Sequence, residues 1–193
     1  HLPYLARRQR QMCIRDSPEP TRAWFTGAFE APTPAQLGAW DAISSGLHAL
    51  VIAPTGSGKT LSSFLWALDS FVREPATEGT AATRVLYVSP LKALGVDVER
   101  NLRAPLVGIT QTAAHQGRPV PRVRVGVRSG DTPAAERRRL QQDPPDILIT
   151  TPESLYLMLT SQARAALAGV RTVIVDEVHA CLLYTSPSPR DLS

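Results

Sequence analysis

The sequence predicts a three-layer α/β domain in which a mostly parallel sheet is wrapped by helices, and three features support this prediction. Short apolar runs recur along the 193 residues, turn-forming residues follow each run, and a stretch with helical spacing then begins. This alternation is typical of βαβ units, and the length suits one domain of ordinary size. The runs predict strands near 49–53, 84–88, 123–127, 147–150 and 172–175. Loops are predicted at 75–83 and 111–121.

The two ends of the chain differ in composition from the rest. RQMCIRDSP near the beginning and CLLYTSPSPRDLS at the end share the letter pairs RD and SP, and both resemble translated sequencing-adapter read-through. We therefore interpret residues 18–180 as the domain and exclude 1–17 and 181–193 from fold reasoning. A genuine disordered tail at each end is the alternative interpretation.

Composition excludes several classes of protein. The formal net charge is +4, of which residues 1–17 contribute +3 and 181–193 contribute zero, so the domain carries +1 and its charge indicates no class of partner. No apolar run approaches the roughly 18 residues of a membrane helix, and because the basic segment at 1–17 has no long apolar stretch before a small-residue cleavage site, we do not expect it to be a secretory signal. We expect a soluble, cytoplasmic protein. The two cysteines lie in the terminal segments and the four histidines are scattered, so neither predicts a disulfide or a metal cluster.

A glycine-rich turn joins the first predicted strand to a helix. ALVIAPTGSGKT has the spacing A-x-x-x-x-G-K-T, with Ala53 where the general phosphate-loop pattern has glycine. Gly56 and Gly58 let backbone N–H groups approach phosphate oxygens, and the helix N-terminus adds partial positive charge. Lys59 can reach between the β- and γ-phosphates, and the Thr60 hydroxyl is placed to ligate Mg²⁺. The predicted nucleotide contacts in this loop are Thr55, Gly56, Ser57, Gly58, Lys59 and Thr60.

The last predicted strand ends in two acids. TVIV leads directly into Asp176 and Glu177, at the end of the strand where open α/β sheets place their ligands. We expect Asp176 to hold Mg²⁺ through water and Glu177 to orient and activate the attacking water. A solvated turn is the alternative, which the upstream phosphate loop argues against. The predicted catalytic residues are Lys59, Asp176 and Glu177, the magnesium ligands are Thr60 and Asp176, and the cofactors are ATP and Mg²⁺.

Further segments occur in the order found in ATPases of helicase superfamily 2, which carry D-E-x-D/H where this chain has DEVH. Before the loop, FEAPTPAQLGAW resembles the Q motif of these proteins, in which a glutamine reads the adenine edge, and Gln36 is that glutamine. Phe29, Phe25 or Trp24 could stack on the base. An amphipathic helix would bury the same aromatic residues.

Three more segments resemble motifs with which these helicases grip a nucleic-acid backbone. They are SPLKAL, GDT and TPES, and each follows a predicted strand. Asp131 and Thr132 also look like a helix cap, and each segment taken singly could be an ordinary capped βα junction. The predicted contacts are Ser89, Pro90, Leu91, Lys92, Gly130, Asp131, Thr132, Thr151, Pro152, Glu153 and Ser154.

The residues within these motifs resemble those of one branch of the superfamily. APTGSGKT, SPLKALGVDVERNL, GDT, TTPESL and DEVHA together resemble the large helicase-related (Lhr-type) DNA helicases over residues 18–180. The resemblance implies a RecA-like domain, the first motor domain of an ATP-driven helicase that moves along single-stranded DNA, with links to DNA repair. It also implies a second RecA-like domain, which supplies arginine fingers. In this resemblance His179 couples the first RecA-like domain to the second. Without that second domain we expect weak Mg·ATP binding and very slow hydrolysis.

Two alternatives remain open on the sequence. An RNA helicase of the same superfamily is one, because motifs that grip the backbone do not choose a sugar. A non-catalytic nucleotide-binding module is the other. Glu177 argues against the second alternative, because a pure sensor does not need the acid that activates water.

Overall fold

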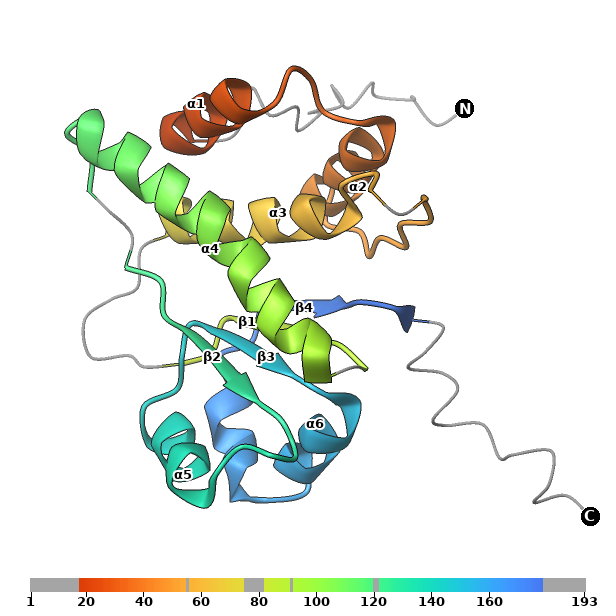
Figure 1. Cartoon of the computed structure of the whole chain (residues 1–193), viewed down its shortest axis with the longest axis vertical. Coiled ribbons are helices and arrows are strands. Elements are labelled where there is room, and N and C mark those ends of the chain that lie inside the picture. Colours follow the sequence, from red (N-terminus) through yellow and green to blue (C-terminus); the bar gives the residue numbers. More distant parts are fainter. Residues whose placement is uncertain (1–17, 55, 75–81, 91, 120–121, 179–193) are drawn as a thin grey trace, which may run out of the picture. The chain divides into compact units, whose positions relative to one another are not determined.

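The computed structural model describes residues 18–178 apart from residue 55, 75–81, residue 91 and 120–121, and it leaves out the side chains of 92–97 and 99–100. The chain divides into two compact units, which are described separately (Figure 1). The first unit comprises His1–Glu74 and Val107–Val120, and the second comprises Pro75–Leu106 and Pro121–Ser193.

Helices and short strands alternate through most of the described chain. The first unit contains α1 (Glu19–Ala28), α2 (Pro34–Ser44), α3 (Lys59–Arg73) and the end of α4 (Lys92–His115). The second unit contains the start of α4 together with β1 (Val85–Val88), β2 (Val125–Arg128), α5 (Ala134–Gln142), β3 (Ile147–Thr150), α6 (Pro152–Leu159), the 3₁₀ helix η2 (Gln162–Leu167) and β4 (Thr172–Val175).

The second unit is built on a parallel sheet. Its strands are ordered β2-β3-β1-β4, and each neighbouring pair runs parallel. Val88 at the end of β1 pairs with Thr150 of β3 on one side and with Val175 of β4 on the other, and Arg128 of β2 also pairs with Thr150. The predicted α/β class and the four predicted strands from 84 to 175 are therefore confirmed.

One face of this sheet carries the hydrophobic core of the second unit. Leu86, Val88 and Leu148 point from β1 and β3 toward Met158 of α6 and Ala163 of η2, and all five are buried. Figure 1 shows α5, α6 and η2 on this side of the strands. Burial on both sides of the central strands suits the apolar composition of β1 and β3.

In the first unit the core lies between helices. Apolar residues recur at helical spacing along α3, and Phe64, Leu65, Leu68 and Phe71 are buried. Trp40 of α2 is also buried, and its indole Nε1 donates a hydrogen bond of 2.9 Å to the carbonyl of Ser62 in α3. This bond fixes α2 against the first turns of α3.

The predicted strand at 49–53 is not formed. The described residues 47–54 have no regular secondary structure, and the side chains of Leu50 and Ile52 are 74% and 86% exposed. An apolar run becomes a strand only when another strand satisfies its backbone N–H and C=O groups. None of the described strands pairs with this segment.

The predicted loop at 111–121 is wrong in its first half. Helix α4 continues to His115, and the turn follows at 116–117. Val98, Leu102, Ile109 and Ala113 are buried at helical spacing along α4. This periodicity extends the helix through polar residues that sequence reasoning assigned to a loop. None of the helices in the described part of the chain is both long enough and apolar enough to cross a membrane.

Gly108 of α4 permits a close approach to α1. A Cβ at this position would lie 2.0 Å from the indole Nε1 of Trp24, and Trp24 also makes an edge contact with Phe29 at 5.9 Å between ring centroids. We therefore expect Gly108→Ala to lower the free energy of unfolding by about 1–3 kcal/mol through overpacking. Urea unfolding followed by circular dichroism measures the change.

Gly38 of α2 is the matched control. It lies in a helix like Gly108, but a Cβ there would meet no atom within 4 Å. Gly38→Ala should raise the free energy of unfolding by about 0.5–1 kcal/mol, because alanine loses less conformational entropy in a helix. Equal effects of the two substitutions would contradict the proposed contact between Gly108 and Trp24.

Candidate functional site

The predicted phosphate loop contains two glycines in the left-handed region of backbone conformation. Gly56 and Gly58 have φ of +82° and +77°, a region that residues with a Cβ rarely adopt. Helix α3 begins immediately after Gly58, and no side chain caps its N-terminus. The Oγ of Ser57 is buried and has no hydrogen-bond partner. The N–H of Ser57 donates to the carbonyl of Pro54 at 3.2 Å. A helix N-terminus without a side-chain cap and an unsatisfied hydroxyl at one turn are compatible with a phosphate group.

The side chain of Lys59 lies over this loop. Its ammonium donates to the carbonyl of Ala53 and, at 2.9 Å, to the carbonyl of Pro54. Thr60 follows in the first turn of α3 and is partly buried. Two of the predicted donors to the nucleotide therefore stand at the start of one helix. Thr55 lies outside the described residues.

Gln36 supports the loop from the start of α2. Thr33 and Gln36 form a capping box, in which the Oε1 of Gln36 accepts from the N–H of Thr33 at 2.9 Å. The Thr33 hydroxyl donates to the carbonyl of Ser57 at 2.9 Å, and the amide of Gln36 donates to the carbonyl of Gly58 at 3.4 Å. A Cβ on Gly58 would lie 2.4 Å from this amide. The predicted adenine-reading residue is thus packed against the phosphate loop.

The three aromatic candidates for base stacking differ in exposure. Phe25 is buried between Phe29 and Trp40, at 4.9 Å and 5.7 Å between ring centroids, and is a core residue. Phe29 is 39% exposed. Trp24 is partly buried and approaches Gly108. Of the three, Phe29 offers the most ring surface to a ligand.

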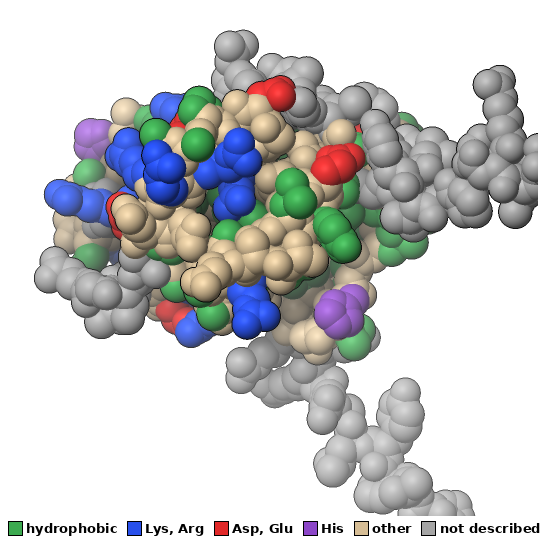
Figure 2. All heavy atoms as spheres, turned by 90° about the horizontal axis from the view of Figure 1, so that it is seen from below, with side chains coloured by type: hydrophobic (Ala, Val, Ile, Leu, Met, Phe, Trp, Pro, Cys, Tyr) green, Lys and Arg blue, Asp and Glu red, His purple; other side chains and the backbone are tan. Residues whose placement is uncertain are grey.

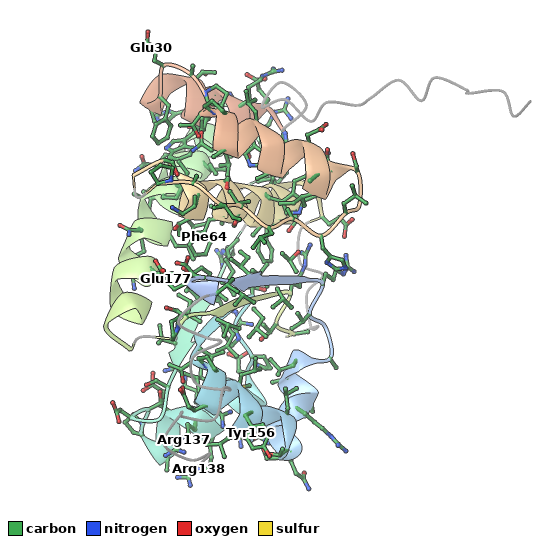
Figure 3. All side chains as sticks on the ribbon, turned by 90° about the vertical axis from the view of Figure 1, so that its right-hand side faces the viewer. Glu30, Phe64, Arg137, Arg138, Tyr156 and Glu177 are labelled. Carbon is green, nitrogen blue, oxygen red and sulfur yellow. The ribbon has the colours of Figure 1, made fainter. Side chains whose placement is uncertain are left out.

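The acid pair lies at the end of β4. The N–H of Asp176 donates to the carbonyl of Val88 at 2.9 Å, which continues the pairing of β1 and β4 by one residue. Asp176 is partly buried, whereas Glu177 is exposed at the end of the strand (Figure 3). Glu177 has φ of +48°, a value uncommon outside glycine and often found at functional sites.

The carboxylate of Asp176 accepts hydrogen bonds at both oxygens. Its Oδ1 accepts from the N–H of Glu177 at 3.0 Å. Its Oδ2 accepts from the hydroxyl of Tyr87, which belongs to β1. Burial raises the pKa of Tyr87 far above its usual value, and the hydrogen bond to Asp176 and the charges of Asp176 and Glu177 raise it further. The hydroxyl therefore stays protonated at ordinary pH.

Polar residues also follow the other strands at the same edge of the sheet. Ser89 comes directly after β1, and its N–H donates to the carbonyl of Thr150 at 3.0 Å. Thr151 comes after β3, and Arg128 ends β2. In the described part of the second unit, the Oγ of Ser89 and the Nε of Arg128 are the buried side-chain atoms without a hydrogen-bond partner. Such atoms at a strand end suggest a polar ligand.

Arg128 is an unusual cation for its position. Its side chain is only 9% exposed. Burial lowers its pKa, and the positive charge of Arg137 lowers it further. Both effects disfavour the guanidinium charge, and a bound anion would relieve them. Sequence reasoning missed Arg128, although an arginine directly after the predicted strand at 123–127 was a visible signal.

The GDT segment forms a turn between β2 and α5. Thr132 is buried, and its Oγ1 accepts from the N–H of Ser129 at 2.8 Å. The predicted helix cap by Asp131 and Thr132 is wrong, because the N-cap is Pro133 and no side chain caps α5. The Thr132 hydroxyl is used to close the turn instead. Gly130 and Asp131 are exposed.

Helix α5 presents arginines next to this turn. The Nε of Arg137 donates to the carbonyl of Thr132 at 2.8 Å. Arg137 and Arg138 lie at the α5 side of the second unit (Figure 3), and both are exposed. Figure 2, seen from below, shows several Lys and Arg side chains together on one face of the molecule.

The TPES segment opens α6 as predicted. Thr151 is the N-cap, and its hydroxyl accepts from the N–H of Ser154 at 3.3 Å. Thr151 and Ser154 are buried, whereas Glu153 is exposed. Pro90 is buried, and Pro152 is partly buried. Leu91, His179 and the side chain of Lys92 lie outside the described residues.

The described residues contain no group of three or more His, Cys, Asp or Glu that could hold a metal ion by themselves. Mg²⁺ does not need such a group, because it is usually bound through one or two protein oxygens, substrate phosphates and water. The hydroxyl of Thr60 and the carboxylate of Asp176 are oxygen donors of this kind.

Comparisons with known proteins agree with these motifs. Residues 33–187 match the DEAD/DEAH box helicase family. The chain is 68% identical over 160 residues to the Lhr helicase/probable uracil glycosylase of Mycolicibacterium smegmatis and 57% identical over 165 residues to the Lhr helicase/uracil glycosylase of Escherichia coli. Each match covers 83% of this chain but only 11% of the relative.

A solved structure of an Lhr helicase is also similar to this chain. It is the helicase Lhr of Mycobacterium smegmatis bound to ssDNA and AMP-PNP, with a TM-score of 0.80 and 64% identity over 85% of this chain and 20% of that chain. A match over most of the chain, together with the phosphate loop and the acid pair, identifies the fold as RecA-like. The chain therefore belongs to the DEAD/DEAH box helicase family.

Proposed function

We propose that this chain is the first motor domain of an ATP-dependent DNA helicase, in which ATP binding and hydrolysis are coupled to movement on single-stranded DNA. The phosphate loop carries the proposal, because it joins two left-handed glycines, an uncapped helix and the orphaned hydroxyl of Ser57. The similarity to Lhr helicases supports the choice of DNA, since a relative with 64% identity is bound to ssDNA.

The described residues fit a nucleoside triphosphate and Mg²⁺. The loop N–H groups and Lys59 would bind phosphate oxygens, and the Thr60 hydroxyl and the Asp176 carboxylate would each offer an oxygen to Mg²⁺ or its water. Mg²⁺, when bound, neutralises charge on the phosphates. Glu177 accepts a proton from the attacking water and orients it, which its exposed position at the end of β4 permits. Asp176 and Glu177 thus have different tasks, one toward the metal and one toward water.

A nucleic-acid strand would follow the polar edge of the second unit. Ser89, Arg128 and Thr151 stand at the ends of three neighbouring strands. Ser89 and Arg128 carry the buried atoms that have no hydrogen-bond partner. Hydroxyl, guanidinium and N–H donors bind the phosphates of a nucleic acid and fix its register, but they do not recognise its base sequence. An RNA helicase is the second candidate, because these donors do not recognise a sugar.

Removal of the loop cation should weaken nucleotide binding. In a titration with a fluorescent ATP analogue, Lys59→Ala should lower the affinity roughly 10- to 100-fold, because a charge-assisted hydrogen bond contributes about 1.5–3 kcal/mol. Arg164→Ala removes an exposed cation of the second unit and is the control. Unchanged affinity in Lys59→Ala would refute the phosphate-loop role.

Hydrolysis by this chain alone should be very slow. The transition state of phosphoryl transfer needs arginine fingers, which are worth about 10³–10⁵ in rate, and we propose that a second RecA-like domain of the longer protein supplies them. Steady-state phosphate release from the purified chain measures this rate. Turnover close to that of an intact helicase, lost on Glu177→Gln, would contradict the proposal.

Arg128 should contribute one phosphate contact. Arg128→Gln should weaken binding of single-stranded DNA and reduce the slope of log affinity against log salt by about 0.7, the value for one contact on a single strand. Arg164→Gln makes the same charge change on η2, in the connection that leads to β4, and should leave the slope unchanged.

The same titration distinguishes the two candidate nucleic acids. Fluorescence anisotropy with DNA and RNA oligonucleotides of one sequence would give the preference directly. Tighter binding of the RNA would favour the RNA helicase, whereas an Arg128→Gln chain with an unchanged slope on both would remove Arg128 from the strand path.

A further inference from the structure

Tyr87 is a buried tyrosine whose hydroxyl needs a partner. It occupies the third position of β1 and is 0% exposed. Its neighbours Leu86 and Val88 belong to the core that packs against α6, and side chains alternate between the faces of a strand, so Tyr87 points to the opposite face. A phenylalanine would bury the same ring without the cost of desolvating a hydroxyl.

The register of the sheet brings this hydroxyl to the acid pair. Tyr87 pairs with Ile174 of β4, and Asp176 lies two residues farther along, on the same side as Ile174. The ring extends along β4 toward the end of the strand, and the hydroxyl donates to the Oδ2 of Asp176. This contact lies within one unit, and its two residues are 89 positions apart in the sequence.

Two donors from different elements hold the carboxylate. The N–H of Glu177 donates to Oδ1 from the chain itself, and Tyr87 donates to Oδ2 from the neighbouring strand. Together they restrict rotation of the carboxylate about its own axis. A carboxylate whose rotation is restricted presents its oxygens in one fixed orientation, and such outer-shell contacts orient groups that hold a metal.

We propose that Tyr87 is a positioning residue for Asp176, which it holds in the orientation that receives hydrated Mg²⁺. The inference rests on the proposed function of Asp176 and adds a residue that no motif of the family resemblance includes. Outer-shell hydrogen bonds of this kind orient the groups that hold a metal. Tyr87 itself touches neither nucleotide nor metal.

The test separates metal binding from nucleotide binding. A non-hydrolysable fluorescent ATP analogue is titrated into the 193-residue chain in excess EDTA and at a series of Mg²⁺ concentrations. Tyr87→Phe should leave the affinity in EDTA unchanged. It should raise the Mg²⁺ concentration for half-maximal gain in affinity by about tenfold, the lower end of the usual effect of losing an outer-shell partner.

Two further variants test whether the change in Mg²⁺ dependence comes from a general loss of stability and whether it acts through Asp176. Thr83→Val removes another buried hydroxyl of the second unit, which donates to the carbonyl of Pro145 at 2.9 Å, and should leave the Mg²⁺ dependence unchanged. In an Asp176→Asn background, Tyr87→Phe should have no further effect on the Mg²⁺ dependence, because the residue acts through Asp176.

Each other outcome overturns the inference. An unchanged Mg²⁺ dependence in Tyr87→Phe, or an equal shift in Thr83→Val, would assign the hydroxyl a general structural role. Loss of the circular-dichroism signal in Tyr87→Phe would assign it to folding. Absence of saturable binding by the unsubstituted chain would refute the proposed nucleotide site, and the inference with it.

Discussion

The parallel, in-register pairing of β1 with β3 and β4 is the constraint on which the second unit depends. Parallel strands deliver their carboxyl ends to one edge of the sheet, so residues that follow different strands become neighbours. Val88 pairs with both Thr150 and Val175, which places Ser89 beside Asp176. A slip of one residue would turn Tyr87 to the other face and remove its hydroxyl from Asp176.

The two ends of this sheet differ in how their polar groups are satisfied. At the amino end, the carboxylate of Asp146 accepts from the N–H of Arg124 at 2.7 Å, and the hydroxyl of Thr83 donates to a carbonyl. At the carboxyl end, buried atoms of Ser89 and Arg128 have no partner. A buried polar group without a partner costs free energy. The polar groups at the amino end are thus satisfied within the sheet, whereas those at the carboxyl end belong to the contacts that we propose for a ligand.

In the first unit, the predicted phosphate loop must be held in place while its N–H groups stay available to a ligand. An anion site needs backbone N–H groups that no protein group already occupies, but the loop must still be held in place. Thr33 and Gln36 hold it through the carbonyls of Ser57 and Gly58, which leaves the N–H groups unused by this contact. Glycine at position 58 is required by its φ of +77° and by the nearby Gln36 amide.

The sequence by itself determined the α/β class, four of the strands, helix α3, the phosphate loop and the acid pair, because these follow from local spacing and glycine placement. The tertiary structure decided the rest. It left 49–53 without a partner strand, extended α4 to His115, and moved the Thr132 hydroxyl from a helix cap to a turn. It also joined Tyr87 to Asp176. These outcomes depend on pairing and burial between residues far apart in the chain, and local patterns do not encode such contacts.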